Sequence, residues 1–277
     1  MNFEFSEEQN LLREQASGFI KDHCSTKVVR KILDGDESYD QELWAKVVEM
    51  GWTATVIPEE YDGLGMSYLE LCVIAEELGR SLAPLPFSSS VYLATEALLV
   101  AGSKEQKEEW LPKLASGSII GCLAAGEGKG QVTPKSLTTS ADASSLSGSK
   151  LPVADGDIAD FAVVFAACDS GDGASTYLVD LNQSSVSRQK LDTIDPSRSH
   201  AKIDFAGASA ELLGKEGEGW ALLNNIYDRA AVLFAWEQVG GAETALEMPR
   251  ITQWEDLPSA VQLLPIRQSS ISLPICM

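Results

Sequence analysis

Long apolar runs, basic residues, histidines and paired cysteines are all scarce in this chain of 277 residues. No stretch of about 18 consecutive apolar residues occurs, so the sequence predicts no membrane-spanning helix. The two histidines, His23 and His200, stand apart, with no pattern of metal ligands or triad partners around them. We therefore expect neither a metal site nor a histidine-based hydrolytic site.

The cysteines, the first residues and the net charge indicate the compartment and the kinds of partner that are expected. Five cysteines form no C-x-x-C pair, and an odd set of this kind is typical of reduced thiols in a cytoplasmic protein. The first residues, MNFEFSEEQ, contain no basic stretch followed by an apolar one, so we do not expect export. Lys and Arg number 21 against 41 Asp and Glu, a net charge of −20, which favours solubility and disfavours nucleic-acid binding.

The periodicity of apolar residues changes twice along the chain. Up to about residue 115 the pattern is helical, and capping boxes at Ser6, Ser67 and Ser103 predict three helix starts. From Ile119 short runs such as IIGCLAA, DFAVVFAAC, STYLVDL and AKIDFAG are typical of strands. Around Gly214 the helical period returns. The order is helices, then strands, then helix, which indicates an α+β multidomain chain.

Four strings in this order resemble the acyl-CoA dehydrogenase family. They are VIPEEYDGLGMSYLELCVIAEELGR, AGSKEQKEEWLPKLASGSIIGCLAAGE, SGSKLPVADGDIADFAVVFA and GKEGEGWALLNNIYDR. The resemblance extends from Met1 to Met248. It implies an N-terminal α-helical domain at 1–117, a middle β-barrel-like domain at 118–214, and the start of a C-terminal helical bundle at 215–248, which is incomplete here.

The resemblance also implies a chemistry. Members of the family hold FAD and use a carboxylate base to remove the α-proton of an acyl-CoA thioester, while the β-hydrogen leaves as hydride to the flavin. The thioester carbonyl has to be polarised and the base positioned, because the α-proton is only weakly acidic. An electron-transfer flavoprotein is the electron acceptor that the resemblance implies, and the chain is expected in a homo- or hetero-oligomer of family chains.

The residues at the implied flavin edge depart from the family pattern. Gly126 stands where the family has a hydroxyl residue, and Ala154 stands where it has another. Pro152 occupies the approximate place of an aromatic residue. The backbones of Ala125, Gly126, Val153 and Ala154 remain the candidates for contact with the flavin. The spaced glycines at 126, 128 and 130 are interpreted as a turn.

Two neighbouring charged residues on the last helix, Asp228 and Arg229, are candidates for the functional site. Asp228 stands where a minority of the family carries its base, and the alternatives are a surface charge or a partner of Arg229. Arg229 is the candidate substrate contact. Glu127 is interpreted as a solvated or helix-capping carboxylate.

The final 29 residues, 249–277, hold four of the 11 prolines and have no helical stripe. Shifted by one base, codons permitted for residues 251–257 encode Asp-Tyr-Ala-Met-Gly-Arg-Phe, and the continuation resembles the flavin-contacting helix of the family. We therefore interpret 249–277 as an aberrant, poorly structured tail produced by a frameshift. Ordered structure should end at Pro249, and the helix over 218–248 should expose an apolar face that its missing partners would cover.

Three functional hypotheses follow. The first is an FAD-dependent acyl-CoA dehydrogenase whose present chain is inactive without the rest of the C-terminal domain. The second is a non-catalytic partner subunit in a heteromeric dehydrogenase, which suits the departures at Gly126, Pro152 and Ala154. The third is oxidase or flavin-monooxygenase chemistry on the same fold.

Overall fold

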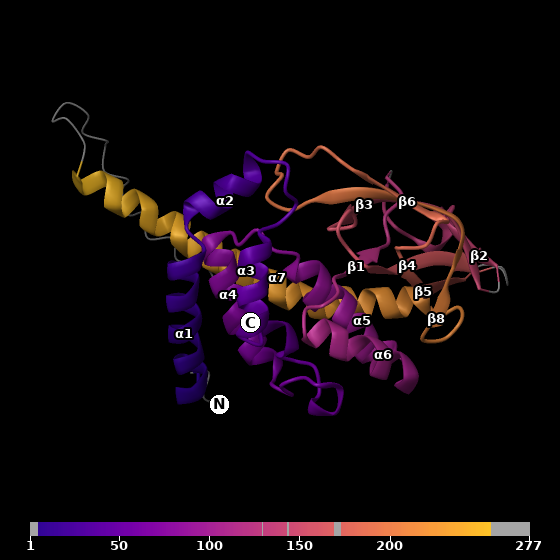
Figure 1. Cartoon of the computed structure of the whole chain (residues 1–277), viewed down its shortest axis with the longest axis horizontal. Coiled ribbons are helices and arrows are strands. Elements are labelled where there is room, and N and C mark those ends of the chain that lie inside the picture. The colour runs from indigo at the N-terminus through magenta and orange to yellow at the C-terminus, as the bar shows by residue number, and fades with distance from the viewer. Residues whose placement is uncertain (1–4, 129, 143, 169–172, 256–277) are drawn as a thin grey trace, which may run out of the picture.

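The computed structural model describes residues 5–128, 130–142, 144–168 and 173–255, with side chains described as far as Met248. Helices gather at one end of the molecule and strands at the other, and one long helix connects the two ends (Figure 1). This arrangement confirms the expected order of a helical part, a sheet and a final helix. No described helix is long and apolar enough to cross a membrane.

The helical part begins at the capping boxes that the sequence predicts. Its elements are α1 (Glu7–His23), α2 (Thr26–Leu33), α3 (Gln41–Glu49), α4 (Tyr68–Ser81), α5 (Glu96–Ala101) and α6 (Lys104–Ala115). Ser6, Ser67 and Ser103 each cap a helix by accepting a backbone hydrogen bond, and each box is closed by the side chain of the third helical residue. Two 3₁₀ turns, η1 (Trp52–Ala54) and η2 (Glu59–Tyr61), lie between α3 and α4.

A π-helix, η3 (Ser88–Thr95), runs directly into α5 and carries buried polar side chains. The sequence does not predict this helix, because the residues SSSVYLAT have no helical stripe. Wide helical turns of this kind occur often at functional sites.

The middle part is an open sheet rather than a barrel. Its strands are β1 (Gly121–Ala124), β2 (Ser140–Asp142), β3 (Ser145–Ala154), β4 (Phe161–Cys168), β5 (Ala174–Asp180), β6 (Val186–Lys190), β7 (His200–Ser209) and β8 (Glu211–Leu213). The order is β6-β7-β3-β2-β4-β5-β8, and β1 pairs with β4. Among the described strands β6 and β8 form the two ends and do not pair, so the sheet does not close and is barrel-like only in a loose sense. Alternating strand patterns predict pairing faces but cannot show whether the ends of a sheet meet.

The long helix α7 (Gly219–Glu255) packs on α4, η3, α5 and β5, and its C-terminal part projects beyond α1 and α2 (Figure 1). Its buried face contains Leu223, Ile226 and Ala230, as the helical stripe predicts, whereas Tyr227 at the margin of that stripe is exposed. The helix continues to Glu255, so it does not end at Pro249. A proline disfavours a helix interior but does not always end one, and Pro112 lies inside α6 in the same way. The rest of the predicted tail, 256–277, lies outside the described residues.

Glycines allow α4 and α7 to approach closely. A Cβ atom at Gly79 would lie 2.0 Å from the carbonyl oxygen of Glu237, and one at Gly240 would lie 2.0 Å from that of Glu76. Real Cβ atoms cannot occupy such positions. The two backbones are therefore in contact at this crossing, and only glycine fits on either side.

Buried polar groups join the helical part to the sheet. The carboxylate of Asp155, in the turn after β3, accepts hydrogen bonds from Ser89 of η3 and from Ser199. The neighbouring carboxylate of Asp157 accepts from Ser199 at 2.6 Å and from Ser38 in the loop between α2 and α3. The string ADGD therefore connects three segments that lie far apart in the sequence.

Candidate functional site

The strand end that carries the predicted flavin contacts is held by a buried ion pair. Lys150 of β3 is fully buried, and its ammonium donates to Glu127 Oε1 at 2.8 Å and to the carbonyl oxygen of Ala125 at 3.2 Å. The N–H of Leu151 donates to the carbonyl oxygen of Gly126 at 2.9 Å. These bonds bring the end of β1 against β3, so Ala125 and Gly126 occupy a fixed backbone edge.

Glu127 is a structural carboxylate in this arrangement. Its side chain is only 12% exposed and accepts from the backbone N–H groups of Thr138 and Thr139 as well as from Lys150. Burial alone would raise the pKa of Glu127, but these hydrogen bonds outweigh burial and lower the pKa to about 2. The expectation of a solvated or helix-capping carboxylate is therefore wrong. Sequence spacing alone did not show that a lysine 23 residues later would be its partner.

Gly126 sits where little beyond a glycine fits. A Cβ atom there would lie 3.2 Å from the carbonyl oxygen of Leu151, a tighter distance than most real Cβ contacts. A flat ligand approaching this edge would therefore meet backbone rather than side chains. Gly128 and Gly130 both have positive φ angles, of 90° and 77°, which agrees with the predicted turn.

Val153 and Ala154 lie on the same strand but face a different neighbour. They stand opposite Ala201 and His200 of β7 in the register of the sheet, and the side chain of Val153 is fully buried. The structure thus brings Ala125 and Gly126 against the Lys150–Leu151 segment, with Val153 and Ala154 further along β3. Neither Gly126 nor Ala154 has a side-chain hydrogen-bond donor, so at these positions only backbone groups could contact a flavin, and the four predicted flavin contacts stay a prediction.

Arg229 lies at a second cluster, formed by α4, α5 and α7. Its guanidinium donates to Glu96 Oε1 at 2.9 Å and to the Tyr68 hydroxyl at 3.3 Å. The Tyr68 hydroxyl in turn donates to Glu96, whose side chain is only 3% exposed. Burial, followed by this contact with Glu96, raises the pKa of Tyr68 to about 12, so the phenol stays neutral.

A small, mostly apolar pocket of about 140 Å³ adjoins this cluster and is lined by Tyr68, Arg229, Val232 and Leu233. The side chain of Arg229 is 46% exposed, and its five N–H donors exceed the bonds it makes to Glu96, Tyr68 and Asn225, so donors are left for a ligand at the mouth of the pocket. This geometry agrees with a role of Arg229 in holding a polar group of a substrate whose apolar part enters the pocket.

Asp228 precedes Arg229 but does not pair with it. Arg229 pairs with Glu96 instead, which makes the partner hypothesis for Asp228 wrong. Asp228 is exposed and has no hydrogen-bond or ion-pair partner among the residues that the structure describes. The structure thus places Asp228 as a surface charge on α7, and its role as a base stays a prediction.

A third cluster was not predicted from the sequence. Arg198, in the connection between β6 and β7, donates to Glu237 of α7 at 3.0 Å and to Ser88 of η3. The Tyr92 hydroxyl donates to the other oxygen of Glu237 at 3.0 Å. A pocket of about 400 Å³ lies beside this cluster. Hydrophobic periodicity indicates that Tyr92 belongs to the core. It does not show that Arg198 and Glu237, which come from different domains, form an ion pair beside it.

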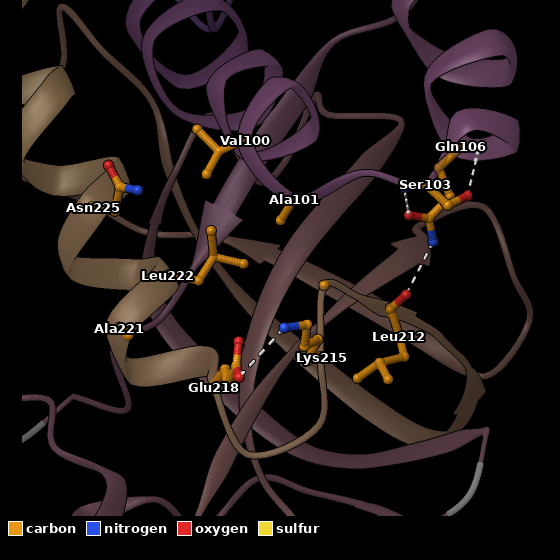
Figure 2. Close-up of a pocket in the computed structure, with 11 residues that line it drawn as sticks. Val100, Ala101, Ser103, Gln106, Leu212, Lys215, Glu218, Ala221, Leu222 and Asn225 are labelled. Carbon is orange, nitrogen blue, oxygen red and sulfur yellow. Dashed lines mark hydrogen bonds and ion pairs between the residues drawn. The ribbon is translucent and has the colours of Figure 1, made fainter.

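Another pocket, of about 530 Å³, lies between α5, α6, β8 and the first turn of α7. Figure 2 shows Val100, Ala101 and Leu222 on its walls, with Lys215 paired to Glu218 at 3.8 Å. Gln106 donates to the carbonyl oxygen of Leu212 at 3.0 Å (Figure 2). None of the predicted site residues lines this pocket, although Asn225 on its rim accepts from Arg229 at 3.1 Å.

Comparisons with known proteins show which proteins the chain resembles. The family model for the acyl-CoA dehydrogenase N-terminal domain matches residues 6–118. The chain is 31% identical, over 243 residues, to acyl-CoA dehydrogenase IpdE2 of Mycobacterium tuberculosis, covering 87% of this chain and 62% of that relative. It therefore spans less than two thirds of the length of that relative.

Solved structures show the same fold. The ChsE4–ChsE5 complex of Mycobacterium tuberculosis is 25% identical with a TM-score of 0.81, and the match covers 94% of this chain and 70% of that one. An acyl-CoA dehydrogenase of Bacillus anthracis, crystallised with FAD, is 22% identical with a TM-score of 0.82, covering 93% and 46%. Sequence and fold agree, and the chain belongs to the acyl-CoA dehydrogenase family.

Proposed function

We propose that this chain takes part in FAD-dependent α,β-dehydrogenation of an acyl-CoA thioester. The observation that carries the proposal is the backbone edge at Ala125 and Gly126, which the buried Lys150–Glu127 pair holds in place within a chain of this family. A bound flavin would supply the hydride acceptor. Ala125 and Gly126, with Val153 and Ala154 along β3, would hold its ring system through backbone groups.

The residues of α7 would act on the thioester. Arg229, anchored by the buried Glu96, would hold a polar group of the ligand at the mouth of the apolar pocket. Asp228 is the described carboxylate nearest in sequence to that anchor, and it would accept the α-proton if no other base reaches the site. Because Asp228 is exposed and nothing orients it, we propose that the chain alone turns over no acyl-CoA.

The test measures FAD binding and the reduction of bound flavin by acyl-CoA in separate steps. The purified chain is titrated with FAD while flavin fluorescence is followed, and an acyl-CoA panel is then added without oxygen. We expect weak FAD binding and no bleaching of the flavin absorbance. Stoichiometric flavin that bleaches with any acyl-CoA would contradict the proposed inactivity. Restoring the predicted reading frame after Met248 should yield a protein that bleaches; the same experiment with oxygen present separates an oxidase from a dehydrogenase.

A non-catalytic partner subunit is the second candidate. The favouring observation is that Gly126 and Ala154 have no side-chain donors where the family has hydroxyl groups. If this proposal holds, the frame-restored chain should also lack FAD and should co-purify with a second family chain that carries it. A flavin-loaded homo-oligomer of the frame-restored chain would contradict the partner role.

A further inference from the structure

Ala154 and His200 lie side by side on the outer face of the sheet. In the antiparallel pairing of β3 with β7, Ala154 stands opposite His200 and Val153 stands opposite Ala201. Side chains at paired positions point to the same face, with Cβ atoms about 4.5–5.5 Å apart. Val153 and Ala201 are fully buried, so their face is the core, whereas Ala154 and His200 are half-buried on the opposite face. The imidazole of His200 is therefore directly beside the methyl group of Ala154.

The imidazole ring of His200 has one nitrogen in a hydrogen bond and one without. Nδ1 lies 3.2 Å from the carbonyl oxygen of Arg198. Because a carbonyl oxygen only accepts, Nδ1 carries the hydrogen of this bond, and in the neutral ring Nε2 is left as an acceptor. No residue that the structure describes forms a hydrogen bond with Nε2. The backbone of Arg198 thus determines which nitrogen of the ring can meet a ligand.

Arg198 brings hydrogen-bond donors to the same place. Its guanidinium donates to Glu237 at 3.0 Å and to the hydroxyl of Ser88, and its side chain is 29% exposed. A guanidinium has five N–H groups, and these bonds use two of them, so donors remain. Arg198 and His200 both line the pocket of about 400 Å³ between the β6–β7 connection, the end of α4 and one flank of α7. The pocket therefore has an acceptor beside several donors, next to Ala154.

We propose that His200 and Arg198 supply the side-chain hydrogen bonds to a flavin that Gly126 and Ala154 lack. The inference rests on the proposed function, in which this chain holds FAD along β3. The polar edge of an oxidised flavin ring presents one N–H, at N3, between two carbonyl oxygens. Nε2 of His200 accepts from this N–H, and the guanidinium of Arg198 donates to a neighbouring carbonyl oxygen.

The charges of the pocket favour the ring of FAD over its phosphates. Asp195 and Glu237 line the pocket together with Arg198. Two carboxylates outnumber the single guanidinium, so the pocket offers no net positive charge to a phosphate group. The oxidised flavin ring is uncharged, and it fits a wall of alternating donors and acceptors.

The bond to N3 is tested without any substitution, by comparing FAD with an analogue that carries a methyl group at N3. The purified full chain is titrated into a trace of either flavin while the fluorescence anisotropy is followed, so no turnover is needed. We expect the wild-type chain to bind FAD at least about fivefold more tightly than the analogue, because the methyl group removes the donor. Equal affinities would overturn the role of His200.

Substitution of His200 then assigns this preference to one residue. His200→Ala should bind FAD about fivefold more weakly than wild type and should no longer distinguish it from the analogue. His200→Gln retains an acceptor and should keep a preference of about twofold or more. His23→Ala is the matched control, because it removes the other histidine, on α1 and outside the pocket, and it should bind like wild type. Circular dichroism checks that the variants fold.

Arg198→Lys separates the two contacts. Lysine keeps a positive charge beside Glu237 but loses the planar fork of N–H groups, so FAD should bind about fivefold more weakly. The preference for FAD over the analogue should remain, because His200 is unchanged and contacts only the backbone of residue 198. An unchanged affinity in Arg198→Lys would overturn the role of Arg198.

Failure of this inference differs from failure of the proposed function. If wild type binds FAD, but neither the methyl group nor the substitutions weaken binding, only the side-chain contacts are wrong. If wild type binds neither flavin at ~1 mM chain, FAD binding by this chain is wrong, and with it both the proposed function and this inference.

Discussion

Glu127 neutralises the buried ammonium of Lys150 beside Ala125, and its removal should lower the stability of the fold. In Glu127→Gln the buried ammonium keeps no anionic partner, which we expect to lower the free energy of unfolding by about 3 kcal/mol. Urea denaturation at pH 7 measures this loss. The double variant Glu127→Gln with Lys150→Met removes both charges and should recover most of it. Equal losses in the single and double variants would contradict the ion-pair explanation.

The same pair predicts a pH dependence with a definite sign. The folded pKa of Glu127, about 2, lies below the value of roughly 4.3 in an unfolded chain. Its contribution is therefore complete above the unfolded pKa and is lost as the pH falls toward about 2. Glu127→Gln should show a flatter loss of stability over that window than wild type does.

Residues of this kind limit what sequence reasoning can assign. Sequence reasoning predicts the turn at Gly128 and Gly130, because a strand followed by spaced glycines is a local pattern, whereas contact of Ala125 and Gly126 with a flavin stays a prediction. It misjudged Glu127 and missed Arg198, Glu237 and Asp155. The partners of these residues come from other elements, and no local period connects them.

At the scale of elements, the crossing of α4 and α7 depends on two glycines. Gly79→Ala or Gly240→Ala would force a Cβ atom into the backbone of the opposite helix. We expect each to lower the free energy of unfolding by at least ~2 kcal/mol, since overpacking costs this much or more. Thermal and urea denaturation measure the effect.

Gly241→Ala is the control for this crossing. A Cβ atom there lies 3.4 Å from the carbonyl oxygen of Gly79, an ordinary contact. Alanine favours a helix over glycine by up to ~1 kcal/mol, so this variant should be neutral or more stable. Similar losses for all three variants would contradict the close-approach explanation, because only Gly79 and Gly240 lie within clash distance of the opposite backbone.

The sequence predicts a helix start wherever it contains a capping box. Ser6, Ser67 and Ser103 each begin a helix as expected. The π-helix at Ser88–Thr95 and the continuation of α7 beyond Pro249 were not predictable. Both depend on packing or on a tolerated proline rather than on a local signal.

At the scale of the whole molecule, Asp155 joins the helical part to the sheet through hydrogen bonds. Its ionisation should make the free energy of unfolding depend on pH. Burial raises the pKa of Asp155 to about 6, against hydrogen bonds from Ser89 and Ser199 that lower it. An unfolded aspartate ionises near ~3.9. Between these values the folded chain holds a proton that the unfolded chain has lost, so stability falls as the pH rises through this window, by about 3 kcal/mol in all.

Asp155→Asn should remove this dependence. The amide stays neutral, can still accept from Ser89 and tolerates the left-handed backbone at this position, where φ is 54°. Urea denaturation at pH 4, 6 and 8 should show a flatter profile for the variant than for wild type. Asp155→Ala, which loses the hydrogen bonds, should be less stable at every pH. An unchanged slope in Asp155→Asn would contradict the assignment.

The sequence by itself determined the order of helices and strands, the helix starts and the family, because each follows from local periodicity, caps and ordered motifs. Only the tertiary structure decided that the sheet stays open, that Lys150 pairs with Glu127, and that Arg229 pairs with Glu96 rather than with Asp228. It also decided which face of α7 is left uncovered. These features depend on which segments, distant in the sequence, pack against one another. The packing determines whether a charge is buried with a partner and whether an apolar face is covered, and therefore how much each contributes to stability.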